Sequence, residues 1–174
     1  MRRLYEGTKR DTTRIRLAIT VAVMIFIFVH SAMPGEVSGS ESRYFAEILA
    51  SISGLSFEVA HFIVRKAAHF TEFTVLGICL AANFYDFKSR NELTKKDESL
   101  AKLAIVRHPL LAAWIAGTLY AGTDELHQLF VEGRSSEFRD VCIDSAGVVL
   151  GIAIVAIVKA MRSGGAADRK GNRC

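Results

Sequence analysis

The sequence predicts an all-α polytopic membrane protein, a bundle of four transmembrane helices with a further amphipathic helix on the outer surface. The 174 residues are 51% hydrophobic and yet 23% charged, so the two kinds must be segregated along the chain. Four apolar blocks each approach the roughly 20 residues that a helix needs to cross a hydrocarbon core of about 30 Å. This pattern excludes a disordered chain and a disulfide scaffold, and it disfavours an ordinary soluble enzyme.

The four predicted spans cover residues 17–33, 67–87, 110–130 and 141–160. Pro34 follows the first block and Pro109 opens the third, where a proline suits a helix end. The first block is longer than the apolar region of a signal peptide, and no small-residue cleavage site follows it. We therefore expect it to be retained, so that residues 17–160 form one membrane domain.

Basic residues indicate which side of the membrane each connection faces. Seventeen of the 22 lysines and arginines lie before residue 17, between residues 86 and 108, or from Lys159 onward. By the positive-inside rule, the N-terminus 1–16, the loop 88–108 and the tail 161–174 are cytoplasmic. Topology and attraction to anionic lipids account for these basic runs, so no nucleic-acid partner is predicted.

A further helix is predicted between the first two spans, over residues 41–53. Apolar residues recur there at helical spacing, among them Tyr44, Ile48 and Ile52, with charged residues between them. Such a pattern is typical of an amphipathic helix that lies on a membrane surface. We expect it on the outer side, ending near Gly54.

Polar and ionisable residues within the spans collect at one depth, near the outer leaflet. They are His69, Glu72, Asp124, Glu125, His127, Gln128, Asp140 and Asp144. Charged groups at membrane depth are costly, and they normally face a bundle interior, pair with one another or line a wet cavity. The sequence therefore predicts a polar vestibule that opens outward.

The candidate ligand-binding residues combine cations with carboxylates and polar groups. They are Arg65, Lys66, His69, Glu72, Asp124, Glu125, Gln128, Arg134 and Asp140. The three cations suit a phosphate, a pyrophosphate or a carboxylate, held by charge-assisted hydrogen bonds. A lipid or a lipid-linked cell-wall precursor would present such a group at this depth, whereas a protein partner or a homo-oligomer is left open.

Catalysis is the first alternative. Glu72, Glu125 and His69 are candidate catalytic residues, because carboxylates and imidazoles can carry protons. The target would be a lipid-linked phosphate, acted on by a hydrolase or a transferase. No nucleophile elbow, phosphate-binding loop or HExxH motif supports this reading.

A metal site is the second alternative. If a divalent cation were bound, its ligands would come from His69, Glu72, Asp124, Glu125, His127, Asp140 and Asp144. The cations at the same depth oppose a bound metal, so no cofactor is favoured.

A non-catalytic accessory protein is the third alternative. Its charges would form a salt-bridge lattice, with Arg65 and Lys66 neutralising Glu72 or Glu125 and Arg134 neutralising Asp140. Gly147 and Gly151 fit a small-xxx-small pattern of close helix packing.

Three motifs in register resemble the VanZ-like family. The first is RK-x-x-H from Arg65 to His69, and the second is DE-x-HQ from Asp124 to Gln128. Gly133-Arg134, Asp140 and Gly147 follow at similar spacing. The resemblance covers roughly residues 31–160.

The resemblance implies a small, multi-pass protein of the bacterial cytoplasmic (inner) membrane, linked to the cell envelope. The namesake of the family confers low-level resistance to the glycopeptide teicoplanin, but no reaction is defined for the family. Two positions depart from the family pattern: Phe73 stands where tyrosine is usual, and Asp144 where asparagine is usual. The extra carboxylate of Asp144 must be protonated, paired or bound to a cation.

Overall fold

The structure is a computed structural model that describes residues 2–33, 35–94, 108–134 and 136–171, with side chains over 11–33, 42–89, 108–134 and 136–163. These residues form five helices and no strand: α1 Arg2–Ser31, α2 Gly35–Ser53, α3 Phe57–Thr94, α6 Pro109–Gln128 and α7 Phe138–Gly171. The predicted all-α fold class is confirmed. The predicted loop 88–108 lies mostly outside the described residues, and α3 occupies its first part.

Three of these helices contain a stretch long and apolar enough to cross a membrane. The stretches are Asp11–Ser31 in α1, Phe57–Ser89 in α3 and Phe138–Ser163 in α7. α6 is not among them, because its last turns carry Asp124, Glu125 and other polar residues within only 20 residues. The fourth transmembrane span therefore stays a prediction.

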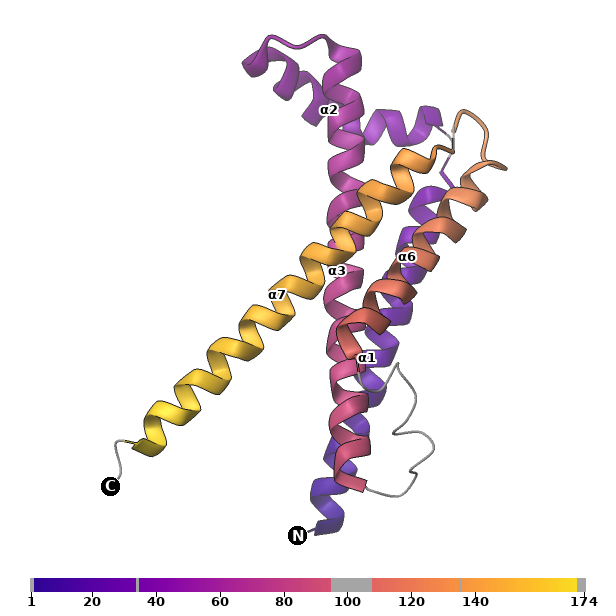
Figure 1. Ribbon diagram of the computed structural model, residues 1–174. Helices are drawn as coiled ribbons and strands as arrows, with labels where there is room; N and C mark the ends of the chain where they lie inside the picture. Colours follow the sequence, from indigo (N-terminus) through magenta and orange to yellow (C-terminus); the bar gives the residue numbers. More distant parts are fainter. Residues whose placement is uncertain (1, 34, 95–107, 135, 172–174) are drawn as a thin grey trace.

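α2 is longer than predicted, since it begins at Gly35 rather than near residue 41. Figure 1 shows it across the end of the bundle that is far from both chain termini. Tyr44, Ile48 and Ile52 form an exposed apolar stripe along it, whereas Ala46 is fully buried. The helix ends at Ser53 and is followed by Gly54, whose φ of 72° is the left-handed conformation common after a helix.

The tightest packing in the bundle lies where α3 and α7 cross (Figure 1). A Cβ added at Gly151 would lie 2.2 Å from the carbonyl oxygen of Thr74, and one at Gly147 would lie 2.5 Å from that of Phe70. The predicted role of these two glycines in close helix packing is confirmed. Gly77 has the same role from the α3 side, because its Cβ would lie 2.4 Å from the Val148 carbonyl oxygen.

Polar contacts fasten α1 to α3 toward the end of the bundle where the termini lie. Thr13 donates a hydrogen bond to Asp86 at 2.7 Å, and the Arg16 guanidinium lies 3.7 Å from the same carboxylate. One helical turn further in, Asn83 donates to the Thr20 hydroxyl at 2.7 Å. α1 is thus positioned by directional bonds as well as by apolar packing.

Candidate functional site

A cavity of about 150 Å³ lies at the opposite end, between α3, α6, α7 and the segment that joins α6 to α7. We call it the charged cavity. It is lined by Phe62, Arg65, Lys66, His69, Glu125, Gln128, Arg134, Glu137, Asp140 and Asp144. Seven of the nine predicted ligand-binding residues therefore come together here, and Glu72 and Asp124 do not. Phe62 and Glu137 belong to the lining although no sequence motif singled them out.

Lys66 and Asp140 form an ion pair across the charged cavity, between α3 and α7. Their side chains are 23% and 5% exposed, so the pair is largely removed from solvent. The second Asp140 oxygen, Oδ1, is buried and accepts no hydrogen bond from the described residues. Asp144 lies one turn further along α7, is buried, and also lines the cavity.

Arg134 follows Gly133, whose left-handed φ of 72° turns the chain back toward the bundle. The Nε of Arg134 donates to the Met33 carbonyl oxygen at 3.2 Å, and Nη2 donates to that of His30 at 3.3 Å. The guanidinium thus binds the end of α1 rather than a carboxylate. Burial lowers the pKa of Arg134, and the nearby charge of Arg65 acts in the same direction, whereas the charges of Asp124, Glu125 and Glu72 oppose this shift.

Arg65 is half-buried on α3 and also lines the charged cavity. Within the part of the chain that the structure describes, neither Arg65 nor Arg134 lies within ion-pair distance of a carboxylate. Two guanidinium groups therefore reach one cavity without the partner that a salt-bridge lattice would give them. The pairing predicted for that lattice is also different, because Lys66 rather than Arg134 neutralises Asp140.

Glu72 and Asp124 lie beside the charged cavity and bind the end of α1. Glu72 Oε1 is 2.7 Å from His30 Nδ1. Ser31 donates to Asp124 Oδ2 at 2.7 Å, and Gln128 donates to the same oxygen at 3.0 Å. Sequence reasoning assigned no site role to His30 and Ser31; the available signal was two polar residues ending an otherwise apolar block.

The remaining carboxylate and histidine candidates take different places. Glu125 lines the charged cavity and accepts a hydrogen bond from the Glu137 backbone N–H at 3.2 Å. His127 stacks on Phe28 of α1, with ring centroids 4.1 Å apart, and does not line the cavity. Among the described residues, no group of three or more histidine, cysteine, aspartate or glutamate side chains has an arrangement that could hold a metal ion.

The fold and the site together define a helical membrane protein with a cluster of ionisable residues around a cavity at one end of the bundle. The family model described as VanZ/LLP1 matches residues 17–159, which is most of the chain. The chain belongs to the VanZ/LLP1 family, as its three motifs predicted. No curated protein and no solved structure matches it.

Proposed function

We propose that the protein is an inner-membrane envelope protein that binds a phosphate-bearing, lipid-linked envelope molecule in the charged cavity. Arg65, Arg134 and Lys66 contact the anion. The observation that carries the proposal is that Arg65 and Arg134 both line one cavity and that neither guanidinium group has a carboxylate within ion-pair distance among the described residues.

An anion between these two arginines would relieve their mutual repulsion. Guanidinium groups make bidentate, charge-assisted hydrogen bonds to phosphate oxygens, and such bonds are stronger where water is excluded. Arg134 still has N–H groups to offer, because its two bonds to α1 use only Nε and one hydrogen of Nη2.

The carboxylates of the charged cavity indicate what else the ligand carries. Glu125 and Asp144 line the same space as the arginines. They are hydrogen-bond acceptors when ionised, so they suit hydroxyl or amine groups attached to the phosphate. A headgroup with both an anion and hydrogen-bond donors fits this lining better than a bare phosphate ion.

The proposal includes four spans, with both termini in the cytoplasm and the charged cavity toward the outer face. The segregation of lysine and arginine supports this orientation. α6 supports a fourth span through an exposed apolar stripe, Leu111, Ile115 and Leu119, which lipid would cover. Its polar last turns would then lie against the charged cavity and the end of α1.

The test uses two lipid probes that carry the same oleoyl chain, 1-oleoyl glycerol 3-phosphate and neutral 1-oleoyl glycerol. Native mass spectrometry of protein in mild detergent should show the phosphate ester bound and the neutral lipid absent. Arg65→Ala and Arg134→Ala should each weaken binding about 10-fold or more, because hydrogen bonds to charged groups contribute about 1.5–3 kcal/mol. Arg43→Ala is the control, since Arg43 is exposed, pairs with Glu47 within α2 and does not line the charged cavity.

Equal binding of the two probes, or equal loss of binding in the Arg65→Ala and Arg43→Ala variants, would contradict the proposal. Release of free phosphate over repeated turnovers would instead favour the hydrolase alternative.

The teicoplanin phenotype implied by the family resemblance has its own test. Expression of the chain in a susceptible strain should lower teicoplanin sensitivity, and Arg134→Ala should abolish that effect.

A further inference from the structure

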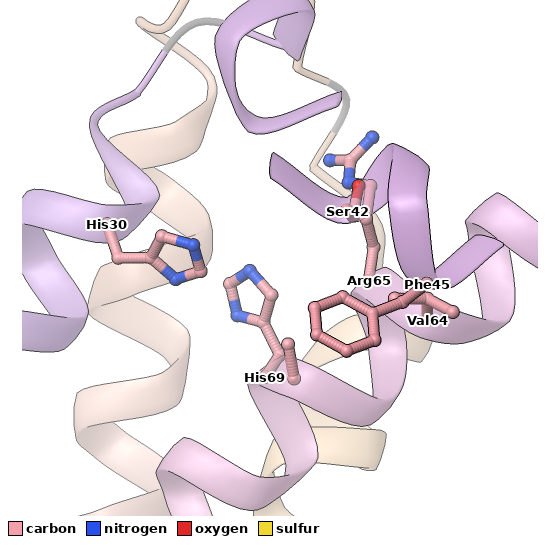
Figure 2. A pocket seen from close by; sticks show the side chains of 7 residues that line it. His30, Ser42, Phe45, Val64, Arg65 and His69 are labelled. Carbon is pink, nitrogen blue, oxygen red and sulfur yellow. The ribbon is translucent and has the colours of Figure 1, made fainter. Parts of the chain in front are cut away.

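A second pocket, of about 170 Å³, lies beside the charged cavity between α1, α2 and α3. We call it the apolar pocket. It is lined by His30, Ser42, Phe45, Val64, Arg65, Ala68 and His69. Figure 2 shows His30 and His69 turned toward one another at one side and the Phe45 ring beside Val64 at the other. The centroids of the two imidazole rings are 6.0 Å apart.

The apolar pocket and the charged cavity share two of their walls. Arg65 and His69 line both spaces. Beyond them the chemistry changes: Phe45, Val64 and Ala68 give hydrocarbon on one side, whereas Lys66, Arg134 and Asp140 give charge on the other. The two pockets are thus neighbours on either side of Arg65 and His69, one with a charged lining and the other with a partly apolar lining.

The apolar pocket reaches the outer surface of the bundle. Phe45, which forms its α2 wall, is 61% exposed. On the α3 side, Phe62 and Ile63 precede the pocket residues and are exposed hydrophobic residues as well. A membrane-embedded bundle would present such residues to lipid, so the surfaces of α2 and α3 beside the pocket suit a hydrocarbon chain. The hydrogen bond between Ser42 and His61, 2.7 Å long, is a polar contact between the same two helices.

We infer that the ligand is a chain-bearing phosphate ester, an amphiphile whose phosphate occupies the charged cavity and whose hydrocarbon chain occupies the apolar pocket and leaves between α2 and α3. The inference rests on the proposed function and adds the place where the hydrocarbon chain of the ligand binds. It also assigns a role to Phe45, Val64 and Ala68, which lie outside the charged cavity.

The test compares 1-oleoyl glycerol 3-phosphate with glycerol 3-phosphate, which has the same headgroup and no chain. Each buried methylene group should raise affinity about fourfold, so the wild-type protein should prefer the oleoyl ester at least about 100-fold. Ala68→Trp fills the apolar pocket and should weaken binding of the oleoyl ester about 10-fold or more, with glycerol 3-phosphate binding unchanged. Ala67→Trp is the matched control, because Ala67 is next to Ala68 in the sequence but is exposed and lines neither pocket.

A second measurement keeps the inference testable if Ala68→Trp does not fold. The wild-type protein is irradiated with an oleoyl glycerol phosphate analogue that carries a diazirine near the ester end of the chain. Labelling of Phe45, Val64 or Ala68 is the expected result. Labelling confined to the α6 stripe, at residues such as Ile115, would overturn the inference.

The two proposals fail in different ways. If glycerol 3-phosphate binds as tightly as its oleoyl ester and Arg65→Ala weakens both, the apolar pocket does not hold the chain but the proposed function stands. The inference is equally overturned if Ala68→Trp and Ala67→Trp behave alike. If neither probe depends on Arg65 and Arg134, the proposed function itself is wrong, and the inference falls with it.

Discussion

The ion pair between Lys66 and Asp140 joins α3 to α7 at the charged cavity, and its burial makes the protein sensitive to the loss of one partner. Lys66→Met should destabilise the protein by about 3–5 kcal/mol, because it leaves Asp140 charged and buried without a counter-ion. The measurement is the free energy of unfolding in SDS, followed by the fluorescence of Trp114, the single tryptophan.

The double variant Lys66→Met with Asp140→Asn separates the pair from the rest of the site. Removal of both charges should restore most of the stability lost in either single variant, since replacing a whole buried pair is often nearly neutral. If the two single losses simply add, the pair is not coupled in the way that the structure shows.

Ser31 provides a second prediction at the scale of single residues. Its side chain is fully buried and donates to Asp124. Ser31→Ala should cost about 1.5–3 kcal/mol of unfolding free energy, the usual range for a hydrogen bond to a charged group. Ser163→Ala is the control, because Ser163 is exposed and bonds only to carbonyl groups of its own helix. Equal, small effects in both variants would show that Ser31 does not fasten α1 to α6.

The sequence predicted which residues converge at the site better than which of them pair. Convergence follows from helical periodicity and a common membrane depth, and it brought Arg65, Lys66 and Arg134 to one cavity as expected. Pairing depends on side-chain reach across particular helix crossings. For that reason the partner of Asp140, and the bonds from Arg134 to backbone carbonyls, could not be read from spacing.

Among the helices, the crossing of α3 and α7 depends on the absence of side chains at three glycines. Gly151→Ala should destabilise the protein by about 1–3 kcal/mol, because its Cβ would overlap the α3 backbone, which cannot move aside as a side chain can. Melting temperature in detergent is a sufficient readout.

Gly122→Ala is the control for this element. Gly122 lies within α6, and an added Cβ there would meet nothing within 4 Å. Alanine is favoured over glycine in a helix by about 1 kcal/mol, so this variant should be neutral or more stable. A similar loss at both glycines would mean that close approach of α3 and α7 is not the cause.

Helix existence was predictable from the sequence, but helix limits and membrane character were less so. α2 begins before the amphipathic pattern that revealed it, because its first turn carries small and polar residues with no apolar periodicity. The first half of α6 predicts a span. Its last turns carry polar residues, some of which line the charged cavity, and these residues lower the overall hydropathy that identifies a span.

For the whole molecule, the proposed topology makes a prediction about sidedness. In a variant with Cys79, Cys142 and Cys174 changed to serine, Glu132→Cys should react with a membrane-impermeant maleimide in intact cells. Ser163→Cys, near the opposite end of the bundle, should react only after permeabilisation. Labelling of both from outside, or the reverse order, would overturn the proposed orientation of the charged cavity.

Because the glycine contacts hold α3 and α7 together where they cross, any change in the angle between the two helices is a rotation about this crossing. Lys66 lies on α3 about 11 Å from the middle of these contacts, at 1.5 Å per residue along the helix. A change of about 5° in the crossing angle would therefore shift Lys66 by about 1 Å, enough to break a hydrogen bond to Asp140. The Lys66–Asp140 pair thus restrains the angle between α3 and α7. Through this angle it also restrains the width of the charged cavity.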